Sequence, residues 1–221
     1  MKIETKIYIA GHNGMVGTAL CRKFSKLGFN NLITYERKEL DLLNQSKTTK
    51  IIKESKPDVV ILLAAKIGGI LENKKFPVNF LYENLAIQNN VIQASFEAKV
   101  KKLLFLGSSC IYPINCIQPM KENMLLSGEL EKTNESYSIA KIAGLKLCEA
   151  ISKQYGLKYF SLMPTNLYGP GDRFNSEYSH VIPNLISKFY KAKKMGSDEV
   201  IVWGTGNPRR EFLYVDDLVD A

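Results

Sequence analysis

Short apolar runs alternate with amphipathic stretches along most of the chain. Five apolar runs predict strands, at residues 7–10, 32–35, 58–65, 103–107 and 159–163. Between them, apolar residues recur at helical spacing over 15–27, 80–92 and 136–155. The run at 58–65 is unbroken and rich in β-branched residues, which is typical of a strand covered on both faces of a parallel sheet.

The order of these elements predicts the fold class. Repeated β-then-α alternation implies an α/β fold with a doubly wound, Rossmann-like parallel sheet, which we expect over residues 1–170. Residues 171–221 are less regular, with a helix expected at 181–194 and a strand at 200–203. We read them as the start of a smaller, incomplete substrate-binding part. Ligands of such sheets bind beyond the carboxyl ends of the strands, so functional residues are expected just after them.

Composition narrows the possible classes of protein. The chain has 221 residues, of which 45% are hydrophobic and 24% charged, as in ordinary globular domains. No apolar run is long enough to span a bilayer, and the N-terminus reaches Gly11 too soon for a signal peptide, so we expect a cytoplasmic protein. The net charge of +8 lies in lysine-rich stretches without interleaved aromatic residues, which argues against a nucleic-acid partner. The cysteines lack metal-ligand spacing and predict free thiols: Cys21, Cys110, Cys116 and Cys148.

A glycine-rich turn directly follows the first predicted strand. Gly11, Gly14 and Gly17 stand three residues apart between this strand and the first helix. Glycine lets the backbone turn tightly and approach a diphosphate, while the helix N-terminus offers N–H donors and a positive dipole end. The position of the triplet in the first strand-to-helix turn predicts a dinucleotide-binding site.

The residues after the second strand bear on the choice of dinucleotide. Glu36, Arg37 and Lys38 follow that strand. An acidic residue at this place binds the ribose hydroxyls of NAD, whereas a basic residue favours the 2′-phosphate of NADP. With both kinds of side chain present, we favour NADP(H), bound through Arg37.

Three polar residues predict proton-transfer chemistry at a carbonyl group. Tyr137 and Lys141 are four residues apart on a predicted helix, so their side chains share one face. A lysine ammonium beside a phenol is expected to lower the pKa of the tyrosine, which can then pass a proton to a carbonyl oxygen. Ser108 follows a predicted strand, where its hydroxyl can hydrogen-bond the same carbonyl. With the glycine turn, these residues resemble the active-site pattern of short-chain dehydrogenases/reductases.

Longer motifs make the resemblance more specific. The chain is similar to the GDP-L-fucose synthase family, an extended branch of these enzymes, at residues 10–17, 64–70, 104–113, 163–170, 179–183, 210–213 and 215–217. The resemblance covers essentially the whole chain. It implies NADPH-dependent 3,5-epimerisation and 4-reduction of GDP-4-keto-6-deoxy-D-mannose to GDP-L-fucose. In this reaction the ketone acidifies C3 and C5, both centres invert by proton exchange, and hydride then reduces C4.

The resemblance assigns roles to individual residues. Cys110 and His180 match the family's proton-transfer pair, and a thiol and an imidazole are suited to moving protons near neutral pH. They join Ser108, Tyr137 and Lys141 in the expected catalytic set.

Substrate and cofactor contacts are implied in the same way. Lys188 (where an arginine is usual), Trp203 and Arg210 match substrate-binding positions. The expected cofactor-binding set is Gly11, His12, Asn13, Gly14, Met15, Val16, Gly17, Arg37, Asp41, Leu42, Leu106, Gly107, Ser108, Ser109, Lys141, Pro164, Thr165, Asn166, Leu167 and His180. Asn13 stands where the family commonly has arginine, which weakens the argument for NADP over NAD. We expect a homodimer that binds a GDP-sugar, with no metal site and no membrane partner.

Other functions remain open. An epimerase-reductase of another GDP-keto sugar, such as a 6-deoxyheptose, would share these motifs. An NAD-dependent sugar-nucleotide 4-epimerase or 4,6-dehydratase would share the fold, but Ser109, Cys110 and Ile111 stand where a dehydratase normally has Thr-Asp-Glu. A truncated, non-catalytic nucleotide-binding protein would bind NADPH and turn nothing over.

Overall fold

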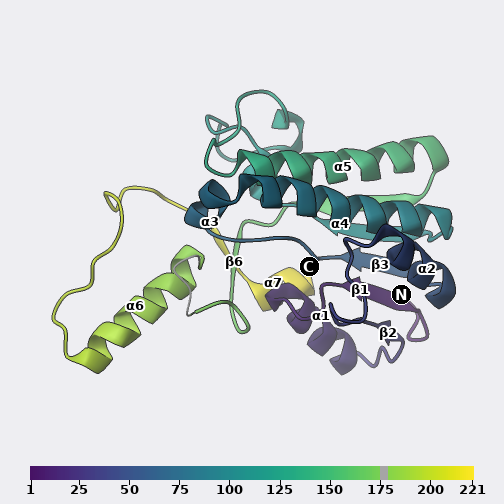
Figure 1. The fold of residues 1–221 in the computed structure, drawn as a ribbon, viewed down its shortest axis with the longest axis horizontal. Helices are drawn as coiled ribbons and strands as arrows, with labels where there is room; N and C mark the ends of the chain where they lie inside the picture. The colour runs from purple at the N-terminus through teal and green to yellow at the C-terminus, as the bar shows by residue number, and fades with distance from the viewer. Residues whose placement is uncertain (175–178) are drawn as a thin grey trace.

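The computed structural model describes residues 1–174 and 179–221, and its centre is a five-stranded parallel sheet (Figure 1). The strands lie in the order β2-β1-β3-β4-β5. Their bounds are β1 (Ile7–Ala10), β2 (Leu32–Ile33), β3 (Val59–Leu62), β4 (Lys102–Leu106) and β5 (Lys158–Leu162). The strand order reverses beside β1, and ligands of open α/β sheets bind at such a point. The expected fold class is confirmed.

Helices cover both faces of this sheet. On one face α4 (Pro77–Glu97) lies between α2 (Gln45–Ser55) and α5 (Glu135–Tyr155) (Figure 1). On the other face α1 (Met15–Lys26) packs against α7 (Val215–Asp220). The sheet is therefore the middle of three layers.

Alternating side chains along the strands divide the core in two. Tyr8, Val60 and Phe105 belong to the cluster that contains residues of α2, α4 and α5. Ile7 and Phe24 belong to a second cluster on the face covered by α1. Burial on both faces explains why the strands read as nearly continuous apolar runs.

Local signals set the ends of the helices. The side chain of Asn44 caps α2 by accepting the backbone N–H of Lys47 at 2.9 Å. Gly28 follows α1 with φ of 82° and Gly156 follows α5 with φ of 70°, values that strain residues with a Cβ atom. Both helices end at these glycines.

The chain beyond β5 leaves the main sheet and returns to it. β6 (Asn166–Tyr168) pairs in parallel with β7 (Phe212–Tyr214), and α7 follows β7 directly. Asp216 of α7 forms an ion pair with Arg22 of α1. Between the two strands, α6 (Val181–Met195) projects away from the sheet (Figure 1). The β6–β7 ladder thus joins the two parts that the sequence divides at residue 170.

The strand predicted at 200–203 is wrong. This segment is irregular and exposed, with 82% of Ile201 and 67% of Trp203 accessible. A strand needs a neighbour for its backbone hydrogen bonds, and no strand in the described parts of the chain pairs with this segment.

The remaining helices are short: α3 (Ile70–Lys75), η1 (Ser109–Ile111) and η2 (Glu122–Met124). Within residues 1–174 and 179–221, no helix combines the length and apolar character needed to cross a bilayer.

Candidate active site

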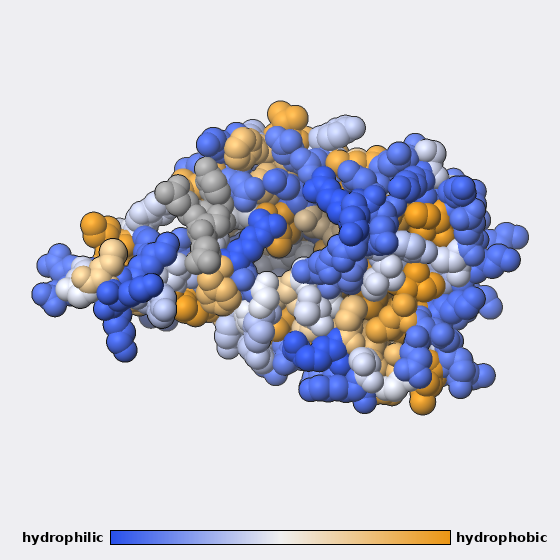
Figure 2. Space-filling model, turned by 60° about the horizontal axis from the view of Figure 1, so that its bottom comes forward, coloured by the Kyte–Doolittle hydropathy of each residue, from blue (hydrophilic) through white to orange (hydrophobic). Residues whose placement is uncertain are grey.

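A cleft opens at the carboxyl edge of the main sheet, between the glycine turn and the segment that leads to α6. Its volume is about 490 Å³. It is lined by the glycine turn, the segments after β3 and β4, the start of α5 and residues around β6. Figure 2 shows a face of the molecule that is hollowed near its centre and bordered mainly by hydrophilic residues. This edge of the sheet is where the fold favours ligand binding.

The glycine turn is packed so closely that side chains have no room at two of its positions. A Cβ atom on Gly11 would lie 2.7 Å from the backbone nitrogen of Ala64, and Gly11 has φ of 98°. A Cβ atom on Gly17 would collide with the carbonyl oxygen of Gly11. At Gly14, by contrast, the nearest atom would be 3.5 Å away. The turn therefore leaves the N-terminus of α1 open to the cleft, as a bound diphosphate requires.

Most of the predicted cofactor-binding residues line this cleft. Those that line it are Gly11, Asn13, Gly14, Met15, Val16, Gly17, Leu106, Gly107, Ser108, Lys141, Pro164, Thr165, Asn166, Leu167 and His180. The others lie outside its walls: His12, Arg37, Asp41, Leu42 and Ser109. The side chain of Arg37 is 77% exposed, and its Nε lies 3.8 Å from the carboxylate of Asp41.

Ser108, Tyr137 and Lys141 meet at the inner end of the cleft. Lys141 is 3% exposed, and its Nζ donates to the carbonyl oxygen of Leu106 at 2.8 Å. The ammonium nitrogen lies 4.6 Å from the ring centroid of Phe105 and 5.7 Å from that of Tyr137. Lys141 is therefore held by the end of β4 and lies over the aromatic ring of Tyr137.

The electrostatics differ from the expectation that Lys141 lowers the pKa of Tyr137. Burial raises the pKa of the Tyr137 phenol, the nearby Cys110 thiol raises it further, and a hydrogen bond with Ser108 lowers it. Burial also lowers the pKa of Lys141 to about 7. The phenol is thus kept protonated, as a proton donor must be. Both pKa values are shifted mainly because the two groups lie in low-dielectric surroundings, which the sequence alone could not show.

Cys110 and His180 line the same cleft from different elements. Cys110 lies in η1, where its backbone N–H donates to the hydroxyl of Ser108 at 3.3 Å. The hydroxyl of Ser138, which is fully buried on α5, donates to the carbonyl of Cys110 at 2.9 Å. His180 immediately precedes α6. The structure therefore brings the five expected catalytic residues to one cavity.

The expected substrate-binding residues lie elsewhere. Lys188 Nζ donates to the carbonyl of Ile201 at 3.0 Å and lies 5.4 Å from the ring centroid of Trp203. Arg210 donates to the carbonyl of Arg209 at 2.7 Å. None of the three lines the cleft. The interactions just given all lie within the segment that carries α6 and the loop after it.

Sequence reasoning gave no site role to several residues of the cleft wall, although some of them lie in the motifs at 64–70 and 179–183. These are Leu63, Ala65, Ile67, Gly68, Asn73, Asn134, Gly171, Asp172, Arg173 and Ser179. Those from Leu63 to Gly68 directly follow β3, so the rule that places ligands beyond strand ends could have identified them. Ser179 lies in the motif at 179–183, and the others reach the cleft through helix and loop packing, which leaves no local signal.

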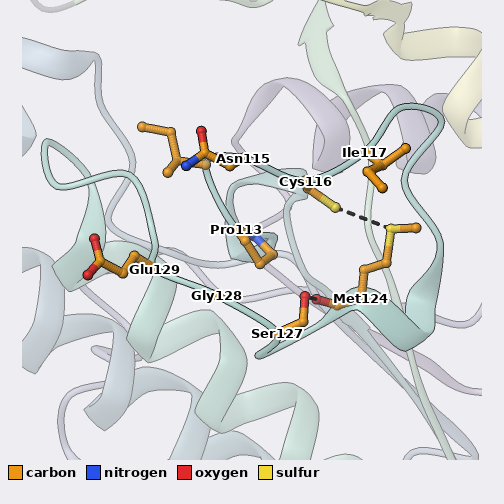
Figure 3. Close-up of a pocket in the computed structure, with 9 residues that line it drawn as sticks. Pro113, Asn115, Cys116, Ile117, Met124, Ser127, Gly128 and Glu129 are labelled. Atoms are coloured by element: carbon orange, nitrogen blue, oxygen red, sulfur yellow. Dashed lines mark hydrogen bonds between the residues drawn. The ribbon is translucent and has the colours of Figure 1, made fainter.

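A second cavity of about 320 Å³ lies in the loop after η1 (Figure 3). Its lining includes Pro113, Cys116, Met124 and Glu129, and the sulfur atoms of Cys116 and Met124 are 3.3 Å apart. It contains none of the expected site residues. Within the described ranges, no group of His, Cys, Asp or Glu side chains could hold a metal ion.

Comparison with known proteins places the chain in a family. The profile of the NAD dependent epimerase/dehydratase family matches residues 7–221. The chain belongs to this family. Among similar proteins, GDP-L-fucose synthase 1 of Arabidopsis thaliana is 54% identical over 218 residues, which cover 99% of this chain and 68% of the relative. GDP-L-fucose synthase of Escherichia coli is 50% identical over 218 residues, with coverage of 99% and 68%.

A similar solved structure agrees with the fold. CJ1428 of Campylobacter jejuni, a GDP-D-glycero-L-gluco-heptose synthase crystallised in the presence of NADPH, has a TM-score of 0.91 and 41% identity. The match covers all of this chain and 73% of that one. The predicted resemblance to the GDP-L-fucose synthase family is confirmed. The chain spans about two thirds of the length of the curated relatives it matches.

Proposed function

We propose that this chain carries the NADP(H)-binding and catalytic part of an enzyme that converts GDP-4-keto-6-deoxy-D-mannose to GDP-L-fucose. One observation carries the proposal: a single cleft is lined both by the glycine turn and by Ser108, Tyr137, Lys141, Cys110 and His180. The similarity to GDP-L-fucose synthases supports the choice of substrate. NADPH, when bound, supplies the hydride that reduces C4.

The residues of the cleft would divide the proton transfers between them. Cys110 and His180 both line the cleft, where one would remove a proton from C3 or C5 and the other would return a proton to the opposite face of the ring. Tyr137, whose raised pKa keeps it protonated, would give its proton to the C4 oxygen. Ser108 would hold that oxygen by a hydrogen bond. Lys141, with a pKa near neutrality, can return a proton toward Tyr137.

The glycine turn would hold the diphosphate of the cofactor. Gly14, Met15 and Val16 line the cleft at the start of α1, where backbone N–H groups lack partners within the helix. The ends of β4 and β5 supply Leu106 and Pro164 on the side of the catalytic residues. We also assign the cofactor-binding part to residues 1–170 and the start of the substrate-binding part to 171–221.

The assembly and location of the protein belong to the same proposal. Val78 and Tyr82 of α4 are 74% and 67% exposed, and Ile139 of α5 is 44% exposed. These apolar side chains support a homodimer formed through α4 and α5. Light scattering after size-exclusion chromatography tests the dimer, and Tyr82→Glu should dissociate it. A cytoplasmic location fits a reaction that consumes NADPH and a nucleotide sugar, and cell fractionation tests it.

The test of the function is a reaction with defined products. The protein is incubated with NADPH and GDP-4-keto-6-deoxy-D-mannose, and both the loss of NADPH absorbance and the product stereochemistry are measured. Formation of GDP-L-fucose supports the proposal. Cofactor oxidation only with a GDP-keto-heptose favours the second candidate, an activity related to the heptose synthase similar to this chain. NADPH binding without turnover of either sugar would indicate a non-catalytic nucleotide-binding protein.

A further inference from the structure

The adenosine end of the expected cofactor site contains an acidic side chain turned toward the glycine turn. Asn13, in that turn, donates through Nδ2 to Oε2 of Glu36 at 2.8 Å. His12 Nε2 lies 3.6 Å from Oε1 of the same carboxylate. Both residues come from the segment between β1 and α1, whereas Glu36 follows β2. Two polar side chains therefore fix Glu36 beside the turn.

Arg37, the neighbouring basic residue, is oriented differently. Its side chain is 77% exposed and lies near Asp41. The backbone N–H of Glu36 donates to the carboxylate of Glu39 at 2.8 Å, which restrains the main chain from Glu36 to Glu39. The side chain that contacts the glycine turn after β2 is thus the acid, and the base extends into solvent.

The charge of Glu36 is maintained by its neighbours. The hydrogen bond from Asn13 lowers the pKa of the Glu36 carboxyl and outweighs the opposing effect of burial, and the nearby His12 and Lys38 lower it further. The carboxylate is therefore ionised at neutral pH. An ionised carboxylate at this position accepts hydrogen bonds from the hydroxyls of the adenosine ribose. It repels a 2′-phosphate, which carries negative charge at the same place.

We infer that Glu36 is a specificity-determining residue that reduces the preference of this chain for NADPH over NADH. Its carboxylate, fixed by Asn13, favours an unmodified ribose and opposes the 2′-phosphate. Arg37 can rotate toward the phosphate because its side chain is exposed and its ion pair with Asp41 is exposed and weak. NADPH is therefore bound, and NADH is accepted as well. The inference rests on the proposed binding of a dinucleotide at the glycine turn.

The experiment measures binding of each reduced dinucleotide without substrate, through the fluorescence of the nicotinamide. For the unmodified protein we expect the dissociation constants for NADH and NADPH to differ by no more than about tenfold. Glu36→Gln keeps the size of the side chain and its bond with Asn13 but removes the charge. It should tighten NADPH binding by roughly tenfold, because a close like charge is removed, and change NADH binding by less than about twofold. Arg37→Ala should weaken NADPH binding only.

A matched control removes an equal charge elsewhere. Glu54 is an exposed residue near the end of α2, where it pairs with Lys50, and Glu54→Gln should leave the ratio of the two dissociation constants unchanged. Equal tightening by Glu54→Gln and Glu36→Gln would indicate a general effect of net charge and overturn the inference. The inference would also be overturned if the protein preferred NADPH by more than about a hundredfold and Glu36→Gln left this preference unaltered. Failure of both dinucleotides to bind overturns the cofactor assignment together with the inference, whereas failure to turn over a GDP-sugar leaves the binding result standing.

Discussion

The cleft at the edge of the main sheet and the segment carrying α6 were both expected to bind ligands, yet they are built in opposite ways. In the cleft, parallel strands deliver each residue to a fixed place, and a buried group such as Lys141 is held by the end of β4. In the α6 segment, Lys188 and Trp203 contact each other and the adjoining loop. Apolar side chains such as Phe189 and Ile201 remain 56% and 82% exposed. A sheet therefore holds residues from different segments in one defined arrangement. Local contacts, such as those of Lys188, hold a residue only relative to its own segment.

The largest expected effect is on the rate of the reaction at the buried end of the cleft. Tyr137→Phe should reduce the rate of C4 reduction by roughly 10²–10⁴-fold, because the proton donor is removed. The dissociation constant for NADPH should change by less than about twofold, since the ring and its packing remain. Steady-state kinetics and a fluorescence titration measure both quantities. Tyr155→Phe, at the exposed end of α5, is the matched control and should behave as the unmodified protein. A normal rate for Tyr137→Phe would remove this residue from the mechanism.

A pair of identical truncations compares the two regions directly. Ile9 is fully buried in β1 and Ile201 is 82% exposed. Ile9→Ala should lower the free energy of unfolding by roughly 2–5 kcal/mol, whereas Ile201→Ala should change it by less than about 0.5 kcal/mol. Urea denaturation measures both. Comparable losses for the two variants would show that the loop after α6 packs as tightly as the sheet.

The proposed proton-transfer role of Cys110 can be separated from reduction. Cys110→Ser should slow proton exchange at the sugar ring by roughly 10²-fold, because a hydroxyl is a much weaker base than a thiolate. Incorporation of deuterium from solvent at C3 and C5, followed by NMR, measures this step. Cys116→Ser changes a cysteine of the second cavity and is the control. Unaltered deuterium incorporation in Cys110→Ser would exclude this thiol from the exchange.

A smaller effect is expected on the pH dependence of stability. The pKa of Lys141 in the folded protein is about 7, below its ordinary value of 10.5, so the unfolded chain binds more protons between these pH values. The free energy of unfolding should therefore rise from pH 7 toward pH 10, by at most about 1.4 kcal/mol per pH unit from this group. Lys141→Met should lose this contribution. Urea titrations at pH 7, 8 and 9 measure the slopes, and parallel curves for both proteins would contradict the assignment.

Much of the architecture was predictable because periodicity reports burial. The strands at 7–10 and 103–107 and the helix at 136–155 follow from apolar spacing alone, and their order implies the sheet. The pairing of β6 with β7 was not predictable, because three-residue strands far apart in sequence leave no pattern. The apolar run at 200–203 has strand composition but no partner in the part of the chain that the structure describes. Composition indicates what a segment can form, and its neighbours decide whether it does.

The same distinction applies within the candidate site. The spacing of Tyr137 and Lys141 predicts one helix face, and both residues line one cleft. It could not reveal that Lys141 bonds to Leu106 and is desolvated there, because that depends on how α5 packs on β4. Likewise, the sequence presents Glu36 and Arg37 side by side. Only the bond to Asn13 distinguishes the one that contacts the glycine turn.

The ladder between β6 and β7 has a consequence for motion. It pairs the two strands between which the segment with α6 lies, so both ends of this segment are held at the same small sheet. Closing a loop removes much of the conformational entropy of a free arm, and the cost grows only slowly with the length enclosed. A segment held at both ends should therefore have less conformational freedom than a free arm, which limits how far His180 can move from the cleft.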